Sequence, residues 1–153
     1  MLNLEHRVPP PIVGLAVAMA MWLLARLPPG FHLATWLREA AALLLVAAGV
    51  TFDFLGILAF LRQRTTVNPL RPQNASALVT GGVYRVTRNP MYVGMALLLT
   101  AWAVQLSSAW PFLGPAAFVL YMNRFQIAPE ERAMHALFGE SWSAYAARVR
   151  RWL

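Results

Sequence analysis

Two polar stretches of the chain carry the residue types from which a site for a charged small molecule could be built. The first begins at a Gly-Gly pair and runs through Tyr84, Arg88 and Tyr92. Asn89 is a good N-cap and Pro90 fits the first helical position, so this stretch is expected to start a helix. A guanidinium beside the N–H groups of a helix start favours an anion, and tyrosine faces can hold a cation. A ligand carrying both charges would suit this stretch.

The second stretch places two adjacent carboxylates, Glu130 and Glu131, ahead of the aromatic residues Trp142 and Tyr145. If the apolar segments between the two stretches form a hairpin, the carboxylates return near Arg88. A zwitterionic amino-acid ligand with a positive centre and a ribose would then find a partner for each part. The alternative interpretation is interfacial anchoring, because Arg, Tyr and Trp are common at the headgroup level of membrane proteins.

The elements that must position these stretches are apolar helices. The chain has 153 residues, of which 59% are hydrophobic and only 12% charged, against about 25% charged in an average soluble domain. This composition excludes a water-soluble globule and a disordered chain. All 13 basic residues are arginine and the net charge is +7. They are spread among apolar segments rather than gathered in a patch, so no nucleic-acid partner is expected.

Cysteine and histidine chemistry is not indicated. The chain has no cysteine, and its three histidines show no ligand spacing, so we expect no metal site. The N-terminus does not fit a signal peptide. Its charge-free stretch, Val8 to Ala25, is long for an h-region, opens on prolines and is followed by no small-residue cleavage site.

Four apolar segments are predicted to span a membrane, at residues 12–27, 37–61, 90–106 and 110–125. The last two come from one charge-free stretch that is too long for a single pass at about 1.5 Å per residue. Serine, proline and glycine interrupt its middle, which favours a hairpin of two short helices.

The arginines predict the orientation. The loop from Arg62 to Arg88 carries five arginines and no acid, and the C-terminal tail is also basic. The positive-inside rule places both in the cytoplasm, and an even number of spans puts the N-terminus there too. Residues 130–151 are predicted as an amphipathic helix on the inner leaflet. The expected fold is therefore an all-α integral membrane protein with a single domain over residues 1–153. The lysine-free, alanine-rich and arginine-rich composition suggests a bacterial inner membrane.

Asp53 lies in the middle of the second predicted span. An acid there costs about 2.5–3.5 kcal/mol on insertion, which the surrounding apolar residues offset at about 0.3–0.6 kcal/mol each. Its side chain is therefore expected to face protein or a cavity. Two interpretations remain open: a structural partner for an arginine or hydroxyl, or a position on a substrate path.

The motif Gly82-x-Tyr84-x-x-x-Arg88-Asn89-Pro90-x-Tyr92-x-Gly94 is followed by Glu130-Glu131 and then by Phe138-Gly139-x-x-Trp142-x-x-Tyr145. In order and spacing these residues resemble the isoprenylcysteine carboxyl methyltransferase family, which is related to the membrane phospholipid N-methyltransferases. The resemblance covers about Ser76 to Trp152, half of the chain.

The resemblance implies a methyltransferase that binds S-adenosylmethionine through the loop 62–89 and the following carboxylates. Arg88 and Glu130 are carried over as the catalytic pair. The cofactor-binding positions are Ala77, Leu78, Val79, Tyr84, Arg88, Asn89, Pro90, Tyr92, Glu130 and Glu131.

The substrate positions are less well matched. Some family members carry histidine where this chain has Ser76, and arginine where it has Gln126. Arg124, two residues earlier, is the candidate to replace that arginine. Asp53 completes the candidate substrate positions.

Methyl transfer from a sulfonium is an in-line displacement in which the protein mainly aligns donor and acceptor. A carboxylate acceptor needs no base, whereas an amine must lose a proton, to Glu130, Glu131 or Asp53. The predicted acceptor is an isoprenylcysteine-type carboxylate or a similar small lipophilic acid that enters from the bilayer. Methylation of a lipid amine is one alternative, and a non-enzymatic four-span scaffold is another. The oligomeric state stays open.

Overall fold

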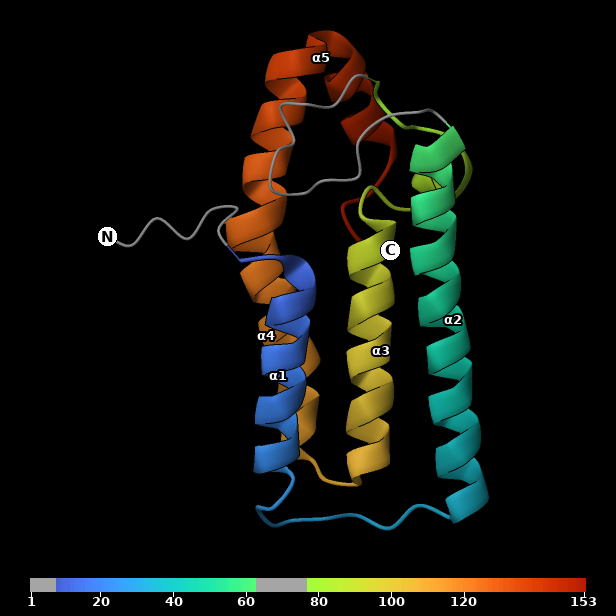
Figure 1. Cartoon of the computed structure of the whole chain (residues 1–153), viewed down its shortest axis with the longest axis vertical. Helices are drawn as coiled ribbons and strands as arrows, with labels where there is room; N and C mark the ends of the chain where they lie inside the picture. The colour runs from blue at the N-terminus through green and yellow to red at the C-terminus, as the bar shows by residue number, and fades with distance from the viewer. Residues whose placement is uncertain (1–7, 63–76) are drawn as a thin grey trace, which may run out of the picture.

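The computed structural model describes residues 8–62 and 77–153, which form an elongated bundle of helices (Figure 1). Its elements are α1 (Pro10–Leu24), α2 (Thr35–Arg62), η2 (Gly82–Arg85), α3 (Pro90–Leu106), η3 (Trp110–Phe112), α4 (Leu113–Met122), η4 (Asn123–Ile127) and α5 (Ala128–Arg148). The described residues contain no strand, so the predicted all-helical class is confirmed for them.

Helix length separates α2 from the other apolar helices of the described residues. Among the described helices, only Thr35–Arg62 is long and apolar enough to cross a membrane. Helices α1 and α3 are apolar but have 15 and 17 residues, or about 23 and 26 Å, against a hydrocarbon core of about 30 Å. The prediction of four spans therefore stays a prediction, although α3 has the bounds expected for the third segment.

Helices α2 and α3 pack closely because glycines face one another. A Cβ added at Gly49 would lie 2.9 Å from the carbonyl oxygen of Gly94, and one added at Gly94 would lie 2.7 Å from that of Gly49. Without side chains at these positions, the two backbones approach directly. This contact fixes α3, and with it the polar stretch at its start, against α2.

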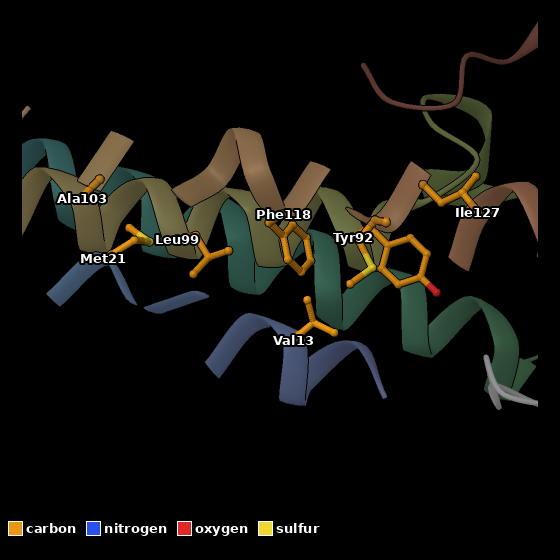
Figure 2. Close-up of a cluster of buried hydrophobic side chains, with 8 residues drawn as sticks. Val13, Met21, Tyr92, Leu99, Ala103, Phe118 and Ile127 are labelled. Atoms are coloured by element: carbon orange, nitrogen blue, oxygen red, sulfur yellow. The ribbon is translucent and has the colours of Figure 1, made fainter. Parts of the chain in front are cut away.

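The main hydrophobic core lies between α1, α3 and the column that α4 begins (Figure 2). Its members include Val13, Leu99 and the fully buried Phe118. Tyr92 also packs in this cluster, with its hydroxyl pointing away from Val13 and Phe118. The first turn of α3 is thereby held from the side opposite α2.

The structure joins the predicted fourth span to the C-terminal helix. Helix α4 runs through the π-helical turn η4 directly into α5, so the amphipathic segment continues the column instead of starting a separate helix (Figure 1). Pro129 does not break this column, because it lies in the first turn of α5, where a missing N–H is tolerated. The column bends only at Gly139, whose φ of 50° favours glycine. Beyond the bend, α5 turns back toward the start of α3.

Candidate functional site

The two polar stretches meet at the end of the bundle where α3 begins. The hairpin of α3 and α4 returns α5 to this end, and the segment after α5 lies against residues 87–89. We use "candidate site" for Tyr84, Arg88, Tyr92, Glu130 and Glu131.

Arg88 is the most heavily bonded side chain of the candidate site. Its Nη1 donates to the carbonyl oxygens of Ala146 (2.8 Å) and Val149 (2.7 Å), and its Nη2 donates to Glu131 Oε1 (2.7 Å). The guanidinium carbon lies 5.8 Å from the centre of the Trp142 ring. Of the three guanidinium nitrogens of Arg88, Nε is the one that is buried without a hydrogen-bond partner among the described residues. Arg88 therefore bonds mainly to other groups of the same chain, and its Nε donor is unused.

Glu131 links Arg88 to the C-terminal tail. Arg151 donates from Nε to Glu131 Oε1 (3.0 Å) and from Nη2 to Oε2 (2.5 Å). Burial disfavours the charged form of Glu131, but the hydrogen bonds and charges of Arg151 and Arg88 outweigh it and lower the pKa. Glu131 is therefore an ionised carboxylate shared by two arginines.

Backbone contacts fasten the tail to the start of α3. The Arg88 N–H donates to the carbonyl of Arg150 (2.9 Å), and Thr87 Oγ1 donates to that of Arg151 (3.1 Å). Asn89 Nδ2 donates to the same Arg151 oxygen (2.9 Å). Asn89 occupies the predicted N-cap position of α3 and Pro90 follows it, but the Asn89 side chain makes no cap bond. Its amide instead donates to the carbonyl of the tail.

Glu130 faces a different partner from its neighbour. It accepts a 2.6 Å hydrogen bond from the Tyr92 hydroxyl and forms no ion pair with a described arginine. Burial raises the pKa of Glu130 to about 8, the Tyr92 hydrogen bond lowers it in part, and the charge of Glu131 adds to the increase. Two adjacent carboxylates thus have opposite pKa shifts, which is a common property of functional sites.

A small second core supports Tyr84. Tyr145 donates a 2.7 Å hydrogen bond to the Tyr84 carbonyl, and the two rings are buried with Val79. The Tyr84 ring makes an edge contact with Phe60 of α2, with centroids 5.5 Å apart. Burial raises the pKa of the Tyr84 hydroxyl above its usual range and that of Tyr145 to about 12. Both phenols therefore stay neutral at physiological pH.

The remaining cofactor positions lie around this second core. Leu78 is partly buried and packs against it, Ala77 is at the edge of the described range, and Pro90 is fully buried. Ser76 lies outside the described residues, as does most of the predicted cofactor-binding loop.

The candidate substrate residues are not gathered with the others. Gln126 is fully buried and donates from Nε2 to the Val8 carbonyl (2.7 Å), whereas the guanidinium of Arg124 lies 5.3 Å from the Phe125 ring. Asp53 contacts Gly94 in the α2–α3 contact, and its Oδ1 is buried without a partner among the described residues. Gly94 and Tyr92 are two positions apart on α3, so Asp53 and Glu130 approach different faces of that helix.

Sequence reasoning missed the role of the tail. In the sequence Arg151 is only one of the basic residues of the tail that predict the orientation, yet it binds Glu131 through two bonds. Asn123 was not considered either, although its Oδ1 accepts from Trp152 Nε1 (3.0 Å). The signal available in the sequence was the position of Arg151 and Trp152. They follow directly after a helix that was expected to return near Arg88.

The phospholipid methyltransferase family model matches residues 37–141. Two rice proteins, from Oryza sativa subsp. indica and subsp. japonica, carry the name probable protein-S-isoprenylcysteine O-methyltransferase. Each is 29% identical over 117 residues, which is 74% of this chain and 60% of the relative. An uncharacterized protein of Haemophilus influenzae is 41% identical over 63 residues, 41% of this chain and 100% of that protein. No solved structure matches the chain. The family resemblance predicted from the motifs is thereby confirmed.

Proposed function

Because the chain belongs to the phospholipid methyltransferase family, we propose that it is a membrane-embedded, S-adenosylmethionine-dependent methyltransferase acting on a lipophilic acceptor. The observation that carries this proposal is the meeting of Arg88, Glu131, Glu130 and Tyr92 at the start of α3. The family model matches the chain as far as residue 141. The chain aligns with only 60% of the length of the rice relatives, so the acceptor is proposed from the chemistry of the site.

The residues present fit the cofactor. The buried, unpartnered Nε of Arg88 is a donor for its carboxylate. Glu130 is bonded through Oε1 to Tyr92 and is the acid to bind its ammonium or ribose hydroxyls. Ala77, Leu78 and Val79 would line the cofactor site beside Tyr84, with Asn89 and Pro90 fixing the start of α3. When bound, S-adenosylmethionine supplies a methyl group already activated by its sulfonium.

The chain's own residues then act mainly by positioning. Glu131 and Arg151 hold the Arg88 guanidinium in place, so that its free donor keeps one direction. For a lipophilic carboxylate acceptor no proton needs to be removed, which suits a site where Glu131 is already paired with Arg88 and Arg151. We place the acceptor's approach from the bilayer along the α2–α3 face, past Asp53, with Gln126 and Arg124 on the α4–α5 side.

A lipid amine is the second candidate acceptor, and one observation favours it. Burial raises the pKa of Glu130 to about 8, which is close to the working pH and suits a group that takes up a proton. An amine acceptor would release that proton during transfer. The two acceptors are separated by whether the methylated product is an ester or an amine.

The proposed orientation in the membrane places the candidate site on the side where the cofactor would be available. We propose that the candidate site, the loop 62–89 and both termini face the cytoplasm of a bacterial inner membrane. The arginines at this end support the orientation by the positive-inside rule.

Binding of S-adenosylmethionine to the detergent-purified protein tests the assignment. The variants are Arg88→Lys and Glu130→Gln, and the matched controls are Arg150→Lys and Glu140→Gln, whose side chains are exposed. We expect each site variant to weaken binding by about tenfold or more, because a charged hydrogen bond is lost. Unchanged affinity in both site variants would refute the assignment, and a thermal unfolding scan of each protein checks that it is folded.

A further inference from the structure

A groove between α2 and α3 lies at the opposite end of the bundle from the candidate site. It has a volume of about 340 Å³ and opens to the surface. Its floor is formed by the buried Ala42 and Ala101, and Leu43 and Trp102 stand beside it. Trp102 Nε1 donates to the Ala18 carbonyl of α1 (3.2 Å), which holds the indole in place. The groove is therefore formed before any ligand arrives.

The outer end of this groove is lined by Glu39 and Gln105, and Arg38 is paired with Glu39 without itself lining the groove. Glu39 accepts hydrogen bonds from Gln105 Nε2 at Oε2 (3.0 Å) and from Arg38 Nη2 at Oε1 (3.3 Å). Arg38 also makes a long contact with Ser107 Oγ (3.4 Å), and its Nε is buried with no partner among the described residues. Arg38 thus has an unused donor directly beside a carboxylate.

We propose that this groove binds one phospholipid with an ammonium headgroup, taken from the surrounding bilayer. Arg38, whose side chain is 30% exposed beside Glu39, binds the phosphate, Glu39 binds the ammonium, and one acyl chain lies over Ala42 and Ala101. The charge pattern is complementary to a zwitterionic headgroup and not to an anionic one. Helix α2 also favours this occupant, because only 11% of its apolar window is buried inside the protein, which leaves an apolar face that suits contact with lipid.

The bound lipid is distinct from a methyl acceptor. Glu39 and Phe60, which contacts Tyr84 of the candidate site, are 21 residues apart on α2, or about 30 Å along the helix. A headgroup bound at Glu39 is therefore out of reach of the candidate site. The inference concerns a structural lipid; it rests on the proposed membrane embedding and not on the proposed methyl transfer.

Lipid retention measured by native mass spectrometry tests the proposal. The full-length protein is purified in mild detergent, and phosphatidylethanolamine, phosphatidylglycerol or diacylglycerol is added without S-adenosylmethionine. We expect phosphatidylethanolamine to be retained in preference to the other two. The variants Arg38→Gln and Glu39→Gln should lower its retention by about fivefold or more, since each removes one charged contact.

The controls keep the test decisive. Arg26→Gln changes an arginine that stacks on Trp22, and Leu44→Phe changes an exposed residue of α2 that does not line the groove. Both should retain the lipid. Ala101→Phe fills the floor and should abolish retention while thermal unfolding reports whether the variant folds.

Equal retention of all three lipids, or retention unaffected by Arg38→Gln and Glu39→Gln, would overturn the proposal. A lipid-free dimer that dissociates in Ala101→Phe would overturn it as well, by assigning the groove to a second copy of the chain.

Discussion

Arg88 and Glu131 form an ion pair of 2.7 Å between the start of α3 and the first turn of α5. Both side chains are mostly buried, with 13% and 20% exposed. Arg151 completes the arrangement from the C-terminal tail, so one carboxylate connects three segments that are far apart in the sequence. The stability of this end of the bundle should therefore depend on Glu131.

The first prediction concerns that ion pair. Glu131→Gln removes the charge that Arg88 and Arg151 share, and it should lower the free energy of unfolding by about 1–3 kcal/mol. The measurement is the midpoint of thermal unfolding in detergent. Glu140→Gln, an exposed acid on the same helix, should change the midpoint by less than one degree or so. Equal effects of the two variants would contradict a stabilising role for Glu131.

The second prediction concerns pH and Glu130. Its pKa is raised from 4.5 to about 8 by burial, so the folded state holds a proton that the unfolded state has released. Stability from this group is full below the unfolded pKa and is lost as the pH rises through about 8. The unfolding midpoint of the wild type should therefore fall between pH 6 and 9 relative to Glu130→Gln. Parallel curves for the two proteins would show that Glu130 titrates normally.

The third prediction concerns the α2–α3 contact. A Cβ at Gly94 would meet Asp53 and the Gly49 carbonyl, so Gly94→Ala should push the helices apart and destabilise the protein by about 1–3 kcal/mol. A Cβ at Gly81 would meet nothing within 4 Å, and its φ is −96°, which makes Gly81→Ala a matched control. Comparable unfolding midpoints for the two variants would mean that the helices can separate without cost.

The fourth prediction concerns orientation. The chain has no cysteine, so single cysteines can be introduced at exposed positions without background. Ser141→Cys lies on α5 beside the candidate site, and Ala109→Cys lies in the link at the other end of α3. In intact bacterial cells a membrane-impermeant maleimide should label only the cysteine at position 109. Labelling of position 141 alone would reverse the proposed orientation.

The sequence was most informative where local rules decide the structure. The bounds of α3 follow from a proline at the first helical position and from a polar break after Leu106. Both features can be recognised in the sequence. The approach of Glu131 to Arg88 followed from the hairpin. The role of the tail did not follow, because its contacts with residues 87–89 run through the backbone carbonyls of Arg150 and Arg151, which any residue type could supply.

The junction of α4 and α5 also escaped sequence reasoning. Pro129 indicates a boundary, but the π-helical turn Asn123–Ile127 joins α4 to α5 without a break, and Pro129 lies in the first turn of α5, where its missing N–H is tolerated. Likewise asparagine is a favoured N-cap residue type. The Asn89 side chain, however, donates to the Arg151 carbonyl of the tail and makes no cap bond. At Asn89 a tertiary contact outweighed a local preference.

The central claim is methyl transfer to a lipophilic acceptor through a site built on Glu130 and Arg88. It is tested most directly by incubating the protein in vesicles of bacterial lipid with S-adenosylmethionine carrying a deuterated methyl group, followed by mass spectrometry of the extract. We predict a labelled methyl group on an ester or amine of the lipid fraction, formed by the wild type and by Glu140→Gln and lost in Glu130→Gln. No labelled product from the wild type, or equal labelling by Glu130→Gln, would contradict the account.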